Sequence, residues 1–494
     1  MDVRWAFVLP FVLPMSDFAQ TDPLPRSSPE AQGISPAAIL SFIDRAEADV
    51  DAIHGFMLLR HGHVVAEGWW APYGPERVHE LHSLSKSFTS TAIGFAVDEG
   101  LVDLDRTVVS FFPDKAPEDA GEHLLSLRVR QLLNMTTGQE ESVDFNGGED
   151  WIAAFLASDF PHKPGTHWVY NSSASFMLSA IVQQVTGQTV FDYLTPRLFE
   201  PLGIEGARWE ENPQGINAGG WGLFARTRDI AALGQFYLQR GAWQGRQLLS
   251  RTWVEEATRK QASNGCEPES DWDQGYGYQF WMCRHGLYRG DGAFGQFCIV
   301  FPEQDAVLAI TSGTGDMAAV MNTAWDTLLP AMEADVPLAE DRALNEALKS
   351  RLAGLTLPVQ SGAATSPLME QVGGRIYRIA DNPMGITGAS LVDEGESQVL
   401  VLETSSGRHR FPAGHGSWLE SISTFSPRGP AQAAASYGWL DEQTWVITGY
   451  LVETAYRNTA VLRFDGDAIE IAMEQNVGFG DEGFPLLTGR MAAE

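Results

Sequence analysis

The residues best suited to chemistry lie in Ser83-Leu84-Ser85-Lys86, which sets a hydroxyl and an amine three residues apart. The apolar residues that follow, up to Gly100, recur with helical spacing, so we expect a helix that begins close to Ser83. Residues i and i+3 lie on one side of a helix, so the Lys86 amine can reach the Ser83 hydroxyl. Free N–H groups and the positive dipole end of the helix favour negative charge near Ser83. The pattern is typical of a serine nucleophile activated by a lysine.

The lysine content of the chain strengthens this interpretation. S-x-x-K is a short motif that also occurs on ordinary surface helices, so by itself it decides little. Burial in an apolar helix disfavours the charged ammonium and lets the amine act as a base. Only one lysine of this chain has a serine three residues before it, Lys86, among the five at positions 86, 115, 163, 260 and 349.

Two other segments could complete such a site. Tyr170 directly precedes an apolar helical run, 176–182, and a tyrosine presented there can relay a proton. A core or surface tyrosine is the alternative. Gly290-Asp291-Gly292 leads into a strand, where glycines let a substrate approach the backbone and leave an N–H free for an oxyanion. A simple turn is the alternative there.

Rival motifs are missing or incomplete. The chain has no G-x-S-x-G nucleophile elbow, no phosphate loop and no G-x-G-x-x-G in a strand–helix–strand context. The histidines of His61-Gly62-His63 and His79-Glu80-Leu81-His82 do not match H-E-x-x-H. We interpret them as hairpin or loop residues and predict no metal site.

Length, composition and net charge limit which classes of protein this chain can belong to. A chain of 494 residues with 44% hydrophobic content can bury a large core and is expected to hold two or more domains. Its net charge of −31 argues against binding to nucleic acid or to an anionic membrane surface. After the N-terminal segment, no stretch is long and apolar enough to span a bilayer.

Cysteine usage and the N-terminus bear on location. The three cysteines lack metal-ligand spacing and cannot all pair within one chain, which favours a reducing, cytoplasmic compartment. The apolar run 5–15 has some features of a signal peptide, but prolines interrupt it and Asp2 and Asp17 flank it. A secreted or periplasmic location stays open if that segment is cleaved.

The pattern of apolar residues divides the chain into two folded parts. Hairpins are predicted for 55–60 with 64–69 and for 296–301 with 306–311, with helices between them. This order indicates an α+β domain whose first and last strands share one sheet. A helical stretch, 338–353, and a linker, 358–367, lead to a second part with predicted strands at 398–402, 444–447, 459–464 and 468–473.

These features predict four segments along the chain. They are an N-terminal extension (1–24), an α+β domain (25–336), a helix with a linker (337–367), and a separate antiparallel β domain (368–494) that is expected to resemble a barrel.

Five ordered segments resemble those of the β-lactamase-related serine hydrolases: Ser83-x-x-Lys86, 132–138, Tyr170-Asn171-Ser172, 219–230 and 290–296. This superfamily includes class C β-lactamases, D,D-peptidases, family VIII esterases and 6-aminohexanoate-dimer hydrolases. The resemblance covers roughly residues 25–335. It implies a β-lactamase/transpeptidase-like fold, in which helices flank an antiparallel sheet and a helical subdomain is attached.

The resemblance also implies roles for single residues. Ser83 would be the nucleophile, Lys86 its activating partner and Tyr170 the proton relay. The backbone N–H groups of Ser83 and Ala293 would form the oxyanion hole, and the reaction would need no metal or cofactor. The C-terminal part resembles lipocalin-like domains attached to some of these hydrolases, where it could shape the cleft, mediate dimerisation or stabilise the first domain.

Departures from the family pattern bear on the substrate. The Lys-Thr-Gly lysine that holds a substrate carboxylate is replaced by Gly290-Asp291-Gly292, which adds a negative charge instead. The usual Tyr-x-Asn ends in Ser172, so Asn171 is the remaining candidate for the amide-binding asparagine. We expect Asp291 to attract a substrate ammonium if it faces the cleft. The expected substrate contacts are Asn171, Ser172, Asp291, Gly292 and Phe294.

These observations predict a cofactor-free serine hydrolase that cleaves small esters or linear amides through an acyl-enzyme. A D-amino-acid peptidase or a weak β-lactamase is the alternative within enzymes. A non-catalytic binding or sensor protein that kept the fold is the alternative of another class, against which the joint presence of Ser83, Lys86 and Tyr170 argues. A small-molecule substrate is the expected partner, and a homodimer is left open.

Overall fold

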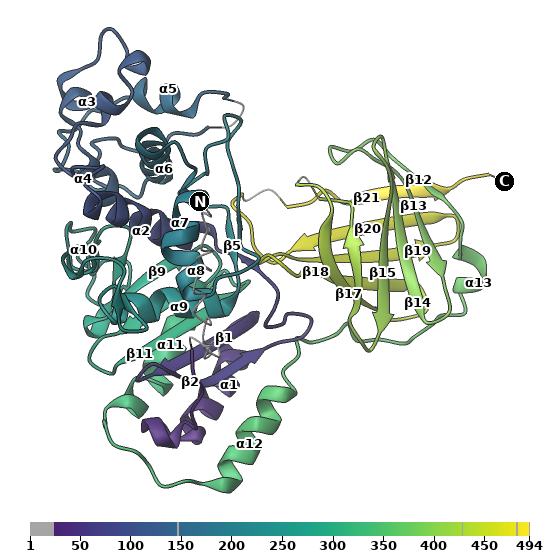
Figure 1. The fold of residues 1–494 in the computed structure, drawn as a ribbon. Helices are drawn as coiled ribbons and strands as arrows, with labels where there is room; N and C mark the ends of the chain where they lie inside the picture. The colour runs from purple at the N-terminus through teal and green to yellow at the C-terminus, as the bar shows by residue number, and fades with distance from the viewer. Residues whose placement is uncertain (1–23, 146–147, 427, 481–482, 494) are drawn as a thin grey trace, which may run out of the picture.

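The computed structural model describes residues 24–145, 148–426, 428–480 and 483–493, which form two domains side by side (Figure 1). The expected N-terminal extension lies outside these residues except for Leu24. The N-terminal domain holds helices on both faces of a sheet, and the barrel domain follows it. A search of the described helices found none long and apolar enough to cross a membrane.

A six-stranded antiparallel sheet lies at the centre of the N-terminal domain. Its order is β2-β1-β11-β10-β9-β8. Both predicted hairpins are confirmed, since β1 pairs with β2 and β10 pairs with β11. β1 also pairs with β11, so the first and last strands share one sheet as expected. The bounds are β1 (Ile53–Arg60), β2 (His63–Trp69), β8 (Trp281–Met282), β9 (Tyr288–Gly292), β10 (Gln296–Phe301) and β11 (Ala306–Ser312).

Helices cover both faces of this sheet, which explains why β1 is buried along its whole length. Successive strand residues point to opposite faces. Phe56 and Leu58 therefore enter the core that includes residues of α1 (Pro36–Asp49), α11 (Met317–Thr327) and α12 (Arg342–Ala353). Met57 and Leu59 enter the other core, which α2 (Ser85–Asp98) and α9 (Thr227–Leu238) share.

The remaining helices and short strands lie mostly beside α2, where they form the predicted helical subdomain (Figure 1). The helices are α3 (Glu122–Ser126), α4 (Val129–Leu133), α5 (Trp151–Leu156), α6 (Ser172–Thr186), α7 (Val190–Leu194), α8 (Glu200–Leu202) and α10 (Arg251–Ala257). Two small sheets are formed by β3 (His79–Glu80), β5 (Leu223–Ala225) and β4 (Arg208–Trp209), and by β6 (Ala242–Trp243) and β7 (Arg246–Gln247).

The second domain is the expected antiparallel β structure, and it closes into a barrel. Neighbouring strands pair in the order β15-β14-β13-β12-β21-β20-β19-β18-β17-β16. A short parallel pairing of β15 with β17 closes the ring, and β16 lies along the rest of β17. The bounds are β12 (Tyr377–Ile379), β13 (Ile386–Asp393), β14 (Ser397–Thr404), β15 (Gly407–His415), β16 (Leu419–Ser423), β17 (Ala431–Trp439), β18 (Thr444–Leu451), β19 (Arg457–Asp465), β20 (Ala468–Gln475) and β21 (Leu487–Met491), with helix α13 (Met369–Val372) before them.

The segment between the domains is fixed at both ends. The predicted helix 338–353 is observed as α12, which begins at Arg342 because the Asp341 side chain caps it. The predicted linker 358–367 lies against the barrel, where Ala363 pairs with Trp439. The Tyr437 hydroxyl also donates to the carbonyl of Ala364 over 3.0 Å. The connection therefore packs as part of the structure.

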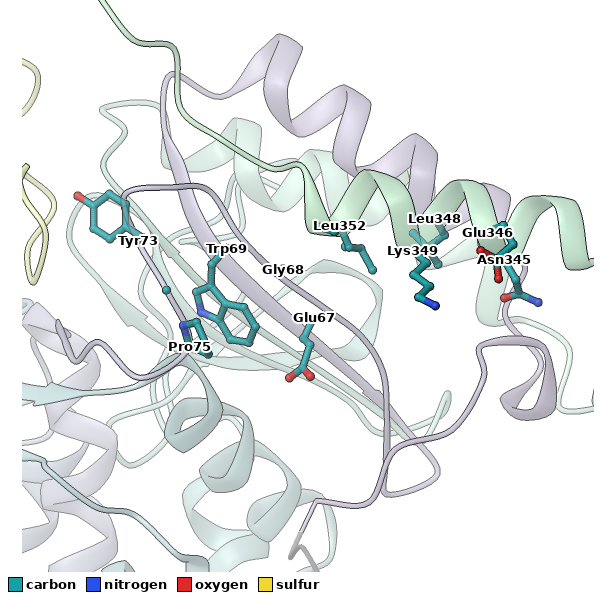
Figure 2. A pocket seen from close by; sticks show the side chains of 12 residues that line it. Glu67, Gly68, Trp69, Tyr73, Pro75, Asn345, Glu346, Leu348, Lys349 and Leu352 are labelled. Atoms are coloured by element: carbon teal, nitrogen blue, oxygen red, sulfur yellow. The ribbon is translucent and has the colours of Figure 1, made fainter. Parts of the chain in front are cut away.

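A groove of about 620 Å³ lies between α12 and strand β2. Figure 2 shows Glu67 and Trp69 from β2 and Lys349 and Leu352 from α12 on its walls. Because β2 is the edge strand farthest from β9 and β8 in the sheet order, this groove is separated from the Gly290–Gly292 segment by the width of the sheet.

Candidate active site

Ser83 lies in a single 3₁₀ turn, η2 (His82–Leu84), directly before α2. The helix expected to start at Ser83 thus starts two residues later, at Ser85. His82 takes a φ of 46°, a left-handed conformation that side chains rarely adopt and that is found mostly at strained, functional positions. His82 and Leu84 are buried, whereas Ser83 is half-buried. The turn therefore presents Ser83 to solvent at the N-terminal end of α2.

Lys86 is buried beside Ser83, with 1% of its surface exposed. Its Nζ lies 2.9 Å from Ser83 Oγ, 3.0 Å from Ser172 Oγ and 2.7 Å from the carbonyl oxygen of Gly220. Burial lowers the pKa of Lys86 to about 7, and the nearby Asp291 carboxylate only partly opposes this. Near neutral pH a large fraction of the amine is therefore uncharged and able to accept a proton.

Tyr170 is held against the same pair of residues. Lys86 Nζ lies 4.8 Å from the centroid of its ring. The ring stacks on Trp281 at a centroid distance of 5.3 Å and meets the edge of Tyr276. Burial raises the pKa of Tyr170, although a hydrogen bond with Ser83 acts against this rise. The structure thus brings Ser83, Lys86 and Tyr170 together, with a phenol that stays protonated at neutral pH.

Strand β9 passes very close to the turn that carries Ser83, and glycine makes this possible. A Cβ atom at Gly290 would lie 2.2 Å from Leu84 Cδ1, and one at Gly292 would lie 2.1 Å from the carbonyl oxygen of Leu81. At Gly292 the obstacle is backbone, so any other residue there would push the strand away, whereas at Gly290 the Leu84 side chain would have to move. Glycine therefore sets the distance between Ser83 and the turn that follows β9.

That turn orients the second expected oxyanion donor. The carbonyl of Gly292 accepts a hydrogen bond from the Gly295 N–H over 3.2 Å. The N–H of Ala293 belongs to the same planar peptide unit as that carbonyl, so it points the opposite way. Ser83 and Ala293 are both half-buried, and neither N–H has a hydrogen-bond acceptor among the described residues.

Asn171 has a structural place, which corrects its expected role as a substrate contact. The residue is fully buried. Its Oδ1 accepts from the N–H of Ala174 over 2.9 Å, so it caps helix α6, and its Nδ2 donates to Gln139 over 2.7 Å. Ser172, which follows it, is half-buried and is the residue that contacts Lys86.

Asp291 does not present a free negative charge, which corrects a second expectation. It is 7% exposed and accepts a hydrogen bond from Arg289 Nε over 2.8 Å. Arg289 is fully buried and also donates to the carbonyl of Asp271 over 2.8 Å. Residues i and i+2 of a strand share a face, which is why the two charges meet. The pair is neutral as a whole, and the buried carboxylate is not presented to a substrate ammonium.

The two remaining expected substrate contacts are occupied by other parts of the protein. Gly292 is buried against the Leu81 carbonyl, as described above. Phe294, with a φ of 66°, packs against His82 and against two residues of the barrel domain, Tyr456 and Phe479. Gly292 and Phe294 thus make contacts within the protein, and their expected role as substrate contacts stays a prediction.

Sequence reasoning missed several residues of this region. The alternation of side chains along β9 could have revealed Arg289 as the partner of Asp291. The Gly219-Gly220 pair was a weaker sign, since the carbonyl of Gly220 contacts Lys86. Glycine is needed at this position because a Cβ atom at Gly220 would lie 2.8 Å from the Ser172 carbonyl oxygen. Tyr456 lies far away in the sequence, and no local pattern marks it.

The histidine pairs have structural partners. His61 contacts Gln32 and Asp335 at the β1–β2 turn, and the buried His79 lies 3.1 Å from His54 through their ring nitrogens. Within the described ranges, no group of three or more histidine, cysteine or acidic side chains is arranged to hold a metal ion.

Comparison with known proteins places this site in a family. The Beta-lactamase family profile matches residues 43–332, which includes Ser83, Lys86, Tyr170 and the whole of β9. The chain belongs to the beta-lactamase family. In this beta-lactamase-related chain the match ends before α12, so the barrel domain is an addition to the family domain.

Two curated relatives are similar over much of their length. A 6-aminohexanoate-dimer hydrolase of Paenarthrobacter ureafaciens is 27% identical over 63% of this chain and 86% of its own length. Penicillin-binding protein 4 of Amycolatopsis lactamdurans is 27% identical over 50% of this chain and 72% of its own length. These relatives support a serine hydrolase that acts on amides or esters.

A solved structure supports the fold. A Bacillus anthracis protein provisionally named a 6-aminohexanoate-dimer hydrolase superimposes with a TM-score of 0.53 and 18% identity, covering 64% of this chain and 89% of its own. This likeness agrees with the α+β sheet and helical subdomain described above.

Proposed function

We propose that the protein hydrolyses small uncharged esters or linear amides through an acyl-enzyme on Ser83, with Lys86 as the base and Tyr170 as the proton donor. One observation carries the proposal, namely that Lys86 Nζ lies 2.9 Å from Ser83 Oγ in surroundings that bring the pKa of Lys86 to about 7. A base with a pKa near the working pH is the most effective one.

Acylation begins when uncharged Lys86 takes the proton of Ser83. The Ser83 oxygen then attacks the substrate carbonyl carbon, and the N–H groups of Ser83 and Ala293 bind the negative oxygen that forms. Tyr170 gives its proton to the leaving oxygen or nitrogen and recovers one from the Lys86 ammonium. This order follows from the two pKa shifts, because the lysine is the group that can be unprotonated at neutral pH and the tyrosine is the one that keeps its proton.

Water completes the cycle by the reverse path. A water molecule gives a proton to Lys86, the base, and attacks the acyl carbonyl carbon. The N–H groups of Ser83 and Ala293 bind the oxyanion again. The bond to Ser83 Oγ then breaks, and the serine recovers its proton. The whole cycle uses only groups of the chain and water.

The charges around Ser83 favour an uncharged substrate. Gly290 replaces the lysine that binds a carboxylate in the related β-lactamases and D,D-peptidases. Arg289 cannot take over that role, because it is fully buried and paired with Asp291. A substrate carboxylate would therefore find no exposed cation supplied by this strand.

Labelling with a serine-reactive fluorophosphonate, followed by peptide mapping, tests the nucleophile. We expect label on Ser83 and its loss in Ser83→Ala, while Ser85→Ala serves as the neighbouring-serine control. Label on any other serine would overturn the assignment. A well-folded enzyme that takes no label would point to the non-catalytic sensor alternative.

A substrate panel tests the reaction. The panel contains p-nitrophenyl esters, 6-aminohexanoate oligomers blocked at both ends so that they carry no charge, D-amino-acid peptides and nitrocefin. We expect turnover of the esters or the linear amides to exceed that of nitrocefin. Faster turnover of nitrocefin or of the D-peptides would replace the proposal with the β-lactamase or peptidase alternative.

A further inference from the structure

The barrel domain encloses a cavity of about 790 Å³. This volume falls within the range of about 300–1,000 Å³ that is usual for small-molecule sites. Apolar side chains from several strands line it, among them Leu400, Leu402, Phe411, Ala435, Ile447 and Met473. Leu400 and Leu402 are two residues apart on β14, so they point to the same, inner side of the barrel. The larger part of the cavity wall is thus apolar, although polar residues such as Asn458 and Thr459 also line it.

Tryptophan side chains pack in the barrel core at the end away from the N-terminal domain. There Trp439 and Trp445 are buried, and both donate their indole N–H to the side-chain oxygen of Gln398. At the other end of β18 the wall is shared with the N-terminal domain, because Trp209 and Phe224 of β4 and β5 also line the cavity. The end that faces the N-terminal domain is therefore a route by which a ligand can reach the cavity. Figure 1 shows β5 next to the barrel.

The charged residues at this mouth are paired with one another. Arg208 contacts Glu453 over 2.7 Å. Arg428 contacts both Glu80, over 2.8 Å, and Glu210, over 3.2 Å. Both arginines that line this mouth contact carboxylates, so neither offers a free positive charge to an anionic ligand.

The cavity wall also contacts both halves of the expected oxyanion hole. The ring of Tyr456 lies 6.2 Å from His82 and 6.0 Å from Phe294, between centroids. His82 directly precedes Ser83, and Phe294 directly follows Ala293. Phe479 contacts the same two residues and lines the cavity, yet 77% of its surface is exposed. Tyr456 and Phe479 thus extend the apolar lining of the cavity to the residues next to Ser83 and Ala293.

We propose that the barrel cavity binds the aliphatic chain of the substrate, an uncharged ester or amide whose reactive carbonyl then lies at Ser83. This inference rests on the proposed function and adds a substrate class to it. Esters with a chain long enough to enter the barrel are preferred over short ones. Short acyl groups react at Ser83 without reaching the barrel.

Variants that fill the cavity test the inference. Ala435→Trp places an indole in the cavity, and Ala460→Phe fills it from another strand. Ala472→Trp is the matched control, because Ala472 is an exposed residue of β20 beside the cavity-lining Met473. Circular dichroism and thermal melting identify which of the variants fold.

Binding is measured without turnover. The uncharged fluorophore N-phenyl-1-naphthylamine is titrated into wild type and into Ser83→Ala, and dodecanol is used to displace it. We expect equal binding to these two proteins, a loss of affinity of about tenfold or more in the cavity-filling variants, and no loss in Ala472→Trp. Equal affinity in the cavity-filling variants and wild type would overturn the proposal.

Turnover gives the second measurement. For p-nitrophenyl esters from acetyl to dodecanoyl, we expect KM to fall with chain length in wild type and in Ala472→Trp but not in Ala435→Trp. Hydrolysis of the acetyl ester should be unchanged in all three. If KM depends on chain length in Ala435→Trp as it does in wild type, the barrel proposal is overturned and the hydrolase assignment stays intact. If none of the proteins hydrolyses the acetyl ester, the proposed function itself is contradicted.

Discussion

At the scale of single residues, the proposed chemistry depends on keeping one amine uncharged. Lys86 Nζ lies within hydrogen-bond distance of three oxygen atoms, yet no carboxylate of the described residues contacts it directly. Burial therefore dominates over the Asp291 charge and lowers the pKa of Lys86 to about 7. The carboxylate of Asp291 is held by Arg289, which limits how far it can stabilise the ammonium.

The pH dependence of hydrolysis follows from this arrangement. For an uncharged ester we expect kcat/KM to be low at pH 5, to rise through a midpoint near the Lys86 pKa of about 7, and to stay level to at least pH 9. The rate rises with pH because the reactive form of Lys86 is the uncharged one. Tyr170 adds no falling limb in this window, because its pKa is raised. A stopped assay across this range checks the profile, and a rate that falls between pH 6 and pH 8 would contradict it.

Asp291→Asn should move that midpoint. The carboxylate raises the pKa of Lys86, so its removal should lower the pKa and shift the rising limb to more acidic pH. Arg289 would also be left buried without its anion, which should reduce the free energy of unfolding by about 3 kcal/mol. Urea denaturation measures this loss.

Asp467→Asn is the matched control for that variant, because Asp467 and its partner Arg490 are both exposed. It should change neither the stability nor the pH profile. A profile for Asp291→Asn that shifts to higher pH would show that the Asp291 charge does not act on Lys86 as described.

The sequence predicted the reacting groups better than their surroundings. Ser83, Lys86 and Tyr170 carry recognisable spacing, and the structure brings them together. Asn171 lies directly before an apolar helical run, a position typical of a helix N-cap, so the sequence did hold a sign of its capping role. No local pattern predicts that Phe294 packs against a distant domain. The sequence identified Asp291 as a charged residue. It did not show that Arg289 pairs with Asp291 and limits the effect of its charge on the site.

At the scale of elements, the site depends on how closely β9 approaches η2. The two hairpins and the shared sheet of the first and last strands were predictable from apolar runs and turn residues, and the strand pairings confirm them. The short distance between β9 and Leu81 was not predictable, since it follows from two glycines meeting a turn that lies about two hundred residues earlier in the chain.

Gly292→Ala tests this approach. The new Cβ atom would lie 2.1 Å from the Leu81 carbonyl, so β9 and the Ala293 N–H must move. We expect kcat to fall about a hundredfold, as for loss of one oxyanion donor, with a smaller effect on KM. Gly74→Ala is the matched control, since nothing lies within 4 Å of a Cβ atom there. Steady-state kinetics with a short ester would contradict the prediction if kcat were unchanged in Gly292→Ala.

At the scale of the whole molecule, the barrel contributes to the surroundings of the site rather than lying apart from it. Arg428 comes from the barrel and pairs with Glu80, which is 1% exposed and lies three residues before Ser83. The second carboxylate oxygen of Glu80 has no hydrogen-bond partner within the described part of the chain.

A cytoplasmic location and a homodimer stay predictions.

Arg428→Ala should therefore weaken the whole protein. Without the guanidinium, Glu80 is left buried beside Glu210, and we expect the free energy of unfolding to fall by about 2 kcal/mol. Arg410→Ala removes a comparable barrel cation whose partner Glu394 is exposed, and it should cost less than about 0.5 kcal/mol. Urea denaturation of both variants measures the two losses in the free energy of unfolding. Equal losses would show that the pairing of Arg428 with Glu80 stabilises the protein no more than an exposed ion pair does.

The packing of Tyr456 on Phe294 and His82 also bears on how the protein is made. A ribosome releases Ser83, Lys86 and Ala293 well before it reaches the codons for the barrel strands. During that interval Tyr456 does not yet pack on the rings of His82 and Phe294. The contact forms only when the last strands have been translated and folded. A truncated nascent chain would thus carry every reacting group and still lack a finished active site.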